Sequence, residues 1–163
     1  MPKRRVVITG MGIVSPVGNT ISDAWDNLLN GKSGITRITR FDASALASQI
    51  AGEVKDFDIT QYMIVKEARR MDIFIHYGMA AAMQAVKDAG IEDVTNSEID
   101  PDRIGVNIGS GIGGLPMIEK TDAVYHKKGP RKISPFFIPS TIINMIAGNL
   151  SIKYNFKGPN LAI

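Results

Sequence analysis

The segment from Gly109 to Ile163 constrains the fold most, because it combines a glycine-dense turn, an apolar helix and the start of a strand. It begins GSGIGGLPMIEK and ends GPRKISPFFIPSTIINMIAGNLSIKYNFKGPNLAI. A turn after a strand, a Pro- and Phe-rich loop, a helix and another strand are typical of an α/β protein. The last strand runs to the final residue, where its ladder groups still need partners, so we expect one piece of a longer protein.

Two other apolar runs predict buried strands of parallel type. They are RVVIT, from Arg5 to Thr9, and IGVNI, from Ile104 to Ile108. Short continuous runs with β-branched residues are typical of strands covered on both faces. Helical segments separate the runs, so the order strand, helices, strand, helix, strand predicts an α/β fold with parallel pairing.

The most regular helical pattern covers about residues 61–89. Its apolar stripe consists of Met71, Phe74, Ile75, Gly78, Met79, Ala82, Met83 and Val86. This spacing predicts one long helix, which Gly90 ends. Ala80, Ala81, Ala82 and Ala85 narrow the helix, which permits close approach to a sheet or another helix.

The remaining segments are shorter or irregular. Ser22 is the expected cap of a helix that carries Trp25, Leu28 and Leu29 on one face and ends at Gly31. Residues 32–60 mix apolar patches with Asp, Ser and Gly, which predicts an irregular cap or small hairpins. Residues 91–102 are predicted to be an acidic, polar connection.

Composition excludes several classes of protein. The 163 residues are 44% hydrophobic and 21% charged, as in soluble globular proteins. A net charge of +3 is too small to argue for nucleic-acid binding by itself. The absence of cysteine excludes a disulfide scaffold and a thiolate metal site, and it fits a reducing compartment. The N-terminal apolar run is too short for a signal peptide or a membrane span.

Gly109, Gly111 and Gly114 satisfy the pattern G-x-G-x-x-G directly after a predicted strand. A dinucleotide site would place a pyrophosphate at the start of the next helix, and it would also need an acidic residue about twenty residues further on. That region is the basic loop GPRKIS instead. We favour the alternative, in which the glycines permit a tight turn and close backbone packing.

Lysine and arginine form one cluster of interest. Lys66, Arg69 and Arg70 follow helical spacing at the start of the predicted long helix, where cations oppose the helix dipole and do not stabilise it. Arg131 and Lys132 lie in the later loop. An acidic partner surface would explain the five cations if they share a face, and a solvated face is the alternative.

The two histidines predict no metal site. His76 flanks the apolar stripe and is expected to be a packing residue, whereas His126 lies in an exposed, lysine-flanked stretch. We expect neither to have a nearby Asp or Glu carboxylate or a second His at metal-binding spacing. The sequence also has no nucleophile elbow, and no pair of carboxylates has an evident catalytic role.

Several long runs together resemble the β-ketoacyl-acyl-carrier-protein synthases, most closely the type II condensing enzymes of fatty acid elongation. They are VVITGMGIVSPVGN, GKSGI, KEARRMDIFIHYGMAAAMQAV, RIGVNIGSGIGG and GPRKISPFFIPSTIINMIAGNLSI. The resemblance implies a thiolase-like fold of two stacked α/β halves, a homodimer in the cytoplasm and no cofactor. Residues 1–163 would be most of the N-terminal half, truncated before the nucleophile.

The resemblance also implies roles for particular residues. Ile112 matches the position that gates or lines the acyl pocket, and Phe137 and Ile138 match residues that reach the partner subunit's pocket. With Phe136, they would form an exposed apolar patch on a lone chain. The residues that match a docking surface for the acidic acyl carrier protein are Lys66, Arg69, Arg70, Arg131 and Lys132.

No catalytic residue is carried over to this chain. The family's nucleophile is a cysteine in a Thr-Ala-Cys run a few residues beyond the position of Ile163, and the catalytic histidines and lysine belong to the second half. The isolated chain is therefore expected to lack condensing activity. The alternatives are a non-catalytic subunit similar to a chain-length factor and a nucleotide-binding module built on Gly109–Gly114.

Overall fold

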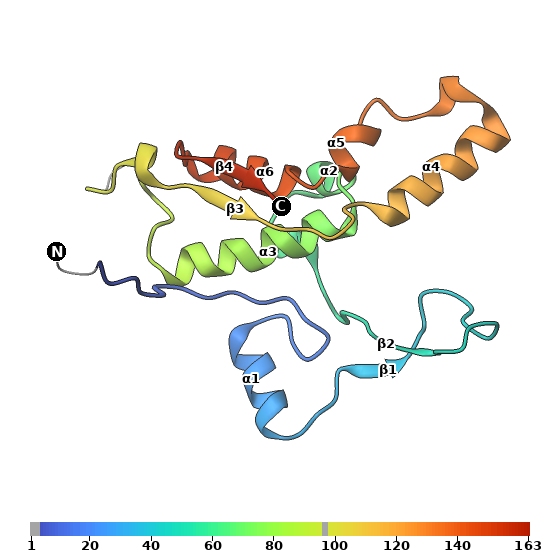
Figure 1. Cartoon of the computed structure of the whole chain (residues 1–163), viewed down its shortest axis with the longest axis horizontal. Coiled ribbons are helices and arrows are strands. Elements are labelled where there is room, and N and C mark those ends of the chain that lie inside the picture. Colours follow the sequence, from blue (N-terminus) through green and yellow to red (C-terminus); the bar gives the residue numbers. More distant parts are fainter. Residues whose placement is uncertain (1–3, 96–97) are drawn as a thin grey trace.

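The computed structural model describes residues 4–95 and 98–163. Figure 1 shows the course of the chain. The helices are α1 (Ile21–Leu29), α2 (Val65–Ala68), α3 (Ile73–Asp88), α4 (Leu115–Lys128), α5 (Phe137–Thr141) and α6 (Met145–Tyr154). The strands are β1 (Ile35–Arg37), β2 (Ile50–Gly52), β3 (Val106–Ile108) and β4 (Asn160–Ala162). Short 3-10 turns are η1 (Ile59–Gln61), η2 (Pro101–Arg103) and η3 (Pro130–Lys132).

The sheet pairing has the predicted parallel character. β3 and β4 are parallel, with Val106 opposite Asn160 and Ile108 opposite Ala162. The two strands confirm the predicted strands at 104–108 and at the end of the chain, although each has only three residues. A separate antiparallel pair, β1 and β2, lies within the predicted cap at 32–60.

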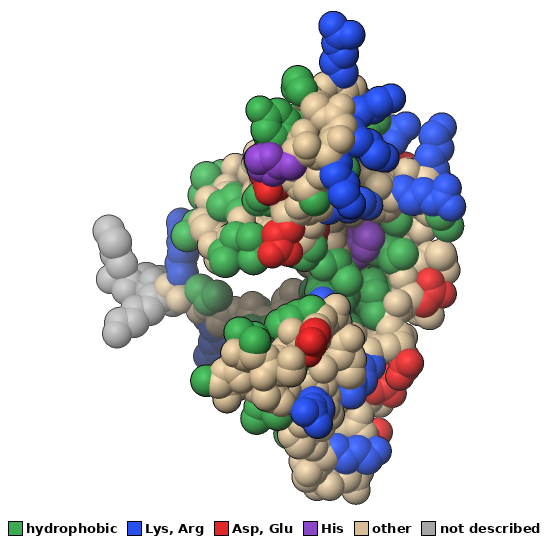
Figure 2. All heavy atoms as spheres, turned by 90° about the vertical axis from the view of Figure 1, so that its right-hand side faces the viewer, with side chains coloured by type: hydrophobic (Ala, Val, Ile, Leu, Met, Phe, Trp, Pro, Cys, Tyr) green, Lys and Arg blue, Asp and Glu red, His purple; other side chains and the backbone are tan. Residues whose placement is uncertain are grey.

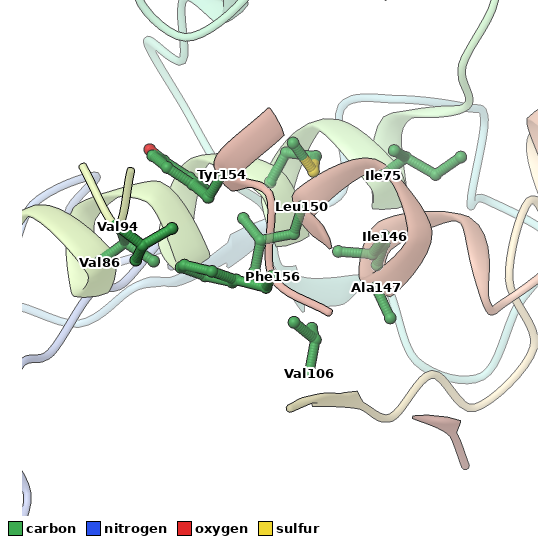
Figure 3. Packing of buried hydrophobic residues seen from close by; sticks show 10 residues of the cluster. Ile75, Val86, Val94, Val106, Ile146, Ala147, Leu150, Tyr154 and Phe156 are labelled. Atoms are coloured by element: carbon green, nitrogen blue, oxygen red, sulfur yellow. The ribbon is translucent and has the colours of Figure 1, made fainter. Parts of the chain in front are cut away.

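The hydrophobic core lies where α6 contacts both α3 and the β3–β4 pair. Its members are Ile75, Met79, Val86, Val94, Val106, Ile146, Ala147, Leu150, Tyr154 and Phe156. Figure 3 shows the side chains of α3, α6 and β3 converging. The predicted stripe therefore points into the core through Ile75, Met79 and Val86, which are all buried.

The close crossing of α3 and α6 depends on a glycine. A Cβ placed at Gly78 would lie 2.6 Å from Ile146 Cδ1 and 2.9 Å from its Cγ2, distances that side chains do not tolerate. Ile146 is itself buried. The absence of a side chain at Gly78 therefore lets Ile146 pack directly on the α3 backbone.

The predicted single helix at 61–89 is wrong in one respect, because the chain breaks into η1, α2 and α3. Asp72 has an extended backbone (ψ 161°), and its amide donates to the carbonyl oxygen of Ser140 at 3.2 Å. This contact with a distant segment turns the chain at a point where the apolar spacing alone predicts continuity. The predicted stop at Gly90 is confirmed, with φ at +69°.

The predicted strand at Arg5–Thr9 is also wrong. In the described residues this segment has no strand partner, and Val6 and Ile8 are 92% and 84% exposed. The residues that follow it lie beside α3 (Figure 1), where the amide of Met11 donates to Asp88 Oδ2 at 2.9 Å. A Cβ at Gly12 would collide with the carbonyl oxygen of Ala81. The alanine face of α3 thus admits a backbone segment that is neither helix nor strand, where the sequence predicts a sheet or another helix.

The first helix has a different cap from the predicted one. Thr20, not Ser22, precedes α1, and its Oγ1 accepts a hydrogen bond from the amide of Asp23 at 3.2 Å. The predicted apolar face is present but uncovered, because Trp25, Leu28 and Leu29 are 59%, 55% and 68% exposed.

The region 32–60 contains a small hairpin, as predicted. Glu53 is buried there, and its carboxylate accepts hydrogen bonds from Thr39 Oγ1 at 2.6 Å and from the Thr39 and Arg40 amides. These bonds, led by that of the Thr39 hydroxyl, hold the pKa of Glu53 below its ordinary value. The predicted polar connection at 91–102 includes residues 96–97, which lie outside the described residues, and contains the first two residues of η2.

Candidate functional site

The glycine-dense turn, Gly109–Gly114, connects β3 to α4 and carries Ile112. Its first end is held to the residue that follows β4, because the Ser110 amide donates to the carbonyl oxygen of Ile163 at 2.8 Å. Its second end is held to α5, because the Gly114 amide donates to the carbonyl oxygen of Thr141 at 3.0 Å. Between these attachments Ile112 is 67% exposed, so its side chain is available to a ligand or another chain.

The start of α4 does not offer a phosphate site. The Met117 amide donates to Asp72 Oδ2 at 2.7 Å, and the Leu115 amide donates to the Gly113 carbonyl. Pro116 has no N–H, and the Asp72 carboxylate occupies the place that an anion would need. The geometry therefore supports the packing role of the glycines and weighs against the dinucleotide alternative.

Glycine is required at the second half of this turn. Gly113 has a φ of +84°, and a Cβ there would collide with the carbonyl oxygen of Thr141. A Cβ at Gly114 would lie 2.9 Å from Thr141 Cα and 3.1 Å from Asp72 Oδ2. These glycines therefore allow the turn to lie directly against α5 and the start of α3.

The apolar residues Phe137 and Ile138 lie on α5, where the sequence predicts a loop. Ile138 is 57% exposed and Phe136, which precedes the helix, is 41% exposed, whereas Phe137 is half-buried. The hydroxyl of Thr141 donates to the Phe137 carbonyl at 3.0 Å. Since α5 packs against α4, the structure brings this apolar segment close to the turn that carries Ile112.

The first group of cations lies on and after α2, not at the start of the long helix. Lys66 is within α2, Arg69 is its C-terminal cap and Arg70 follows it. The argument from an opposed helix dipole is therefore wrong, because cations at the end of a helix favour it. The guanidinium carbon of Arg70 lies 4.3 Å from the centroid of the Phe136 ring, which joins this group to the apolar segment.

The second group of cations lies at the far end of α4. Arg131 and Lys132 form η3, directly after the basic last turn of α4 with Lys127 and Lys128. The space-filling view in Figure 2 shows Lys and Arg side chains gathered over the upper part of the face that it presents. All five cations of the predicted docking surface are exposed, and no carboxylate in the described part of the chain pairs with them.

The histidines have separate structural settings. His76 Nε2 lies 2.9 Å from the Ala68 carbonyl oxygen, which confirms its role as a packed residue with a satisfied ring nitrogen. His126 Nε2 lies 3.4 Å from Asp122 Oδ1, so the prediction that it has no nearby carboxylate is wrong. His126 and Asp122 are one helical turn apart on α4. Among the described residues, no three His, Cys, Asp or Glu side chains converge as a metal ion would require.

A groove that the sequence does not predict lies between η1, α2 and α6. Its volume is about 960 Å³, and its walls include Tyr62, Met63, Met71, Phe136 and Met145. Methionines that are distant in sequence meet here, and their recurrence is the only sequence signal for an adaptable apolar surface. Arg70 also lines the groove, next to Phe136.

Comparison with known proteins decides the family. Residues 3–163 match the family model described as beta-ketoacyl synthase, N-terminal domain. This chain belongs to the β-ketoacyl synthase family. In the described residues of this family member, no helix is both long enough and apolar enough to cross a membrane.

Curated members of the family are similar over the whole chain. The 3-oxoacyl-[acyl-carrier-protein] synthase 2 of Vibrio harveyi is 57% identical over 163 residues, which are 100% of this chain and 39% of that protein. The synthase of the same name from Vibrio cholerae serotype O1 is 58% identical over the same shares. This β-ketoacyl synthase chain thus spans about two-fifths of the length of the relatives that it matches.

Solved structures show the same fold. A ketosynthase of a type II polyketide synthase, in complex with an acyl-carrier protein, has a TM-score of 0.75 at 26% identity and covers 95% of this chain and 40% of its own. The ishigamide ketosynthase/chain length factor has a TM-score of 0.85 at 24% identity, over 99% of this chain and 40% of its own. The chain therefore has the fold of the N-terminal region of thiolase-like ketosynthases.

Proposed function

We propose that this chain is the N-terminal part of a 3-oxoacyl-acyl-carrier-protein synthase 2, which condenses malonyl and acyl groups on carrier protein during fatty acid elongation. The observation that carries the proposal is the 57–58% identity to two such synthases over all 163 residues. A homodimer in the cytoplasm is part of the proposal. The chain itself has no cysteine, so it contributes binding surfaces and pocket shape rather than the family's nucleophile.

The acyl pocket is one of these contributions. Ile112 is held on a glycine turn whose two ends are hydrogen-bonded, and the segment with Phe137 and Ile138 lies close by on α5. Exposed apolar side chains on rigidly held backbone suit a pocket for an alkyl chain. We assign Ile112 to the control of pocket depth, and Phe137 and Ile138 to the wall that a second subunit shares.

Carrier-protein docking is the other contribution. The five exposed cations have no carboxylate partners in the described part of the chain, and one group of them is tied to the acyl-pocket segment through Arg70 and Phe136. The solved ketosynthase in complex with an acyl-carrier protein supports this kind of partner. An acidic carrier would be steered to such a surface and held with a strong dependence on salt.

The pocket is tested in a chimera in which these 163 residues replace the matching 39% of the Vibrio harveyi relative. The substitution Ile112→Phe is expected to lower kcat/KM for long acyl primers at least about tenfold relative to short primers, because the larger ring reduces the depth of the pocket. Steady-state kinetics with acyl-carrier proteins of graded chain length measures this ratio.

The matched control is Ile50→Phe, which makes the same change at an exposed position of β2 in the hairpin. It is expected to leave the ratio unchanged. An unaltered ratio in the folded Ile112→Phe chimera would remove Ile112 from the acyl pocket.

A further inference from the structure

Three buried polar residues meet where α3, α4 and α5 converge. Asp72, Ser140 and Thr141 are only 4%, 2% and 6% exposed. Asp72 starts α3, and the other two residues end α5. Buried polar groups are costly unless their hydrogen bonds are made, so this cluster calls for a specific reason.

Asp72 connects the other two elements through both its backbone and its side chain. Its amide donates to the Ser140 carbonyl oxygen at 3.2 Å, and its Oδ2 accepts from the Met117 amide at 2.7 Å. The second bond is short and charge-assisted, and it lies at the positive end of the α4 dipole. The start of α4 is therefore attached to the start of α3 by one carboxylate.

The side chain does not serve its own helix. Asp72 occupies the N-cap position of α3, yet it makes no capping hydrogen bond there. Its Oδ1 is buried and has no hydrogen-bond partner among the described residues. Burying a carboxylate oxygen without a hydrogen bond costs free energy. The one hydrogen bond that this side chain accepts comes from a different helix, so a positioning role explains the residue better than a contribution to stability.

The backbone that Asp72 holds is the end of the Ile112 turn. Gly113 and Gly114 lie directly before α4, and the space for a Cβ on Gly114 is limited by Asp72 itself. The other end of the turn is held by the bond from Ser110 to Ile163. Since Ile112 is exposed, these attachments and not packing determine where its side chain lies.

We propose that Asp72 is the positioning residue of the acyl pocket: its carboxylate holds the turn that carries Ile112 and thereby sets acyl-length discrimination. The inference rests on the proposed function, because it needs Ile112 to line the pocket. Asp72 also follows the docking segment, two residues after Arg70, so the carrier surface and the pocket turn share one attachment point.

The test replaces Asp72 in the chimera described above. Asp72→Asn removes the charge and keeps the shape, and Asp72→Ser keeps a good N-cap residue for α3 but is too short to reach Met117. Asp72→Ser is expected to bring the long-to-short ratio of kcat/KM at least about fivefold closer to one, because Ile112 is held less firmly. Asp72→Asn, whose amide oxygen still accepts a hydrogen bond but carries no charge, is expected to shift the ratio in the same direction by a smaller factor. Hydrogen exchange over residues 110–117, measured by mass spectrometry, is expected to become faster.

The control for a general loss of stability is Val86→Ala, which makes a cavity in the core at the far end of α3. It lowers the amount of active enzyme for all primers alike and leaves the ratio unchanged. The Ile112→Phe chimera separates the two proposals. If it shifts the ratio and the folded Asp72 variants do not, the inference about Asp72 is overturned while the pocket stands.

If neither Ile112→Phe nor the Asp72 variants change the long-to-short ratio of kcat/KM, the proposed acyl pocket itself is contradicted. Loss of folding in both Asp72 variants would also overturn the inference, because it would assign the carboxylate to stability.

Discussion

Reversing Lys66 and Arg69 to glutamate together is expected to lower kcat/KM for carrier-linked substrates by about a hundredfold in the chimera. Both side chains are exposed and lack carboxylate partners in the described part of the chain, so their field acts on an approaching acidic protein. Two reversals replace attraction by repulsion, which slows association and weakens the complex. The effect is expected to shrink as salt rises from low to physiological concentration.

The control is the double reversal Lys32→Glu and Lys55→Glu, which changes the net charge equally at exposed positions outside the proposed surface. This control is expected to change kcat/KM for carrier-linked substrates only slightly. Acyl thioesters of pantetheine alone, which carry no acidic protein, are expected to react equally well with both double variants. An equal loss with these small substrates would show that the first pair acts on the pocket or the fold and not on docking.

The crossing of α3 and α6 gives the second large effect. Gly78→Ala is expected to lower the free energy of unfolding by about 1–3 kcal/mol, because the new methyl group meets the buried Ile146 side chain. Gly148→Ala makes the same change in α6 where no atom lies within 4 Å, so it gains helix propensity, up to about 1 kcal/mol. Urea denaturation measures the difference in the free energy of unfolding between the two variants.

Because both substitutions gain the same intrinsic helix propensity, the gap between them isolates the contact with Ile146. A Gly78→Ala variant as stable as Gly148→Ala would mean that the two helices are not held at this distance.

Elements with local signals could be predicted from the sequence. The run IGVNI contains β3, because β-branched residues and the following glycines mark a buried strand and its end. Gly90 ends α3 because its positive φ suits glycine. The mixture of apolar patches with Asp, Ser and Gly at 32–60 predicted an irregular cap or small hairpins, and β1 and β2 form such a hairpin.

Elements that depend on distant partners could not be predicted. RVVIT has the composition of a buried strand, but burial requires neighbours, and the described residues place no strand beside it. The break before α3 follows from the bond between Asp72 and Ser140, which are 68 positions apart in the chain. An aspartate before an apolar run is a helix-start signal, and it could have located this break.

In the candidate site, too, features with local signals could be predicted and contacts between distant residues could not. The turn that carries Ile112 and the apolar segment 136–138 could be located from their residues, since glycine and exposed aromatic groups are local features. The bond between Asp72 and Met117 could not, because nothing in the spacing of the two residues indicates that they meet. Their contact follows only from the tertiary arrangement, which brings the start of α3 next to the start of α4.

The most direct measurement of the central claim is the condensing activity of the chimera with acyl- and malonyl-carrier protein. If this chain supplies the docking surface and pocket of a synthase 2, the chimera forms a 3-oxoacyl product two carbons longer, with release of carbon dioxide, within about tenfold of the parent rate. The 163-residue chain alone is expected to form none. A folded chimera that releases no carbon dioxide and makes no product, while the parent enzyme does, would contradict the claim.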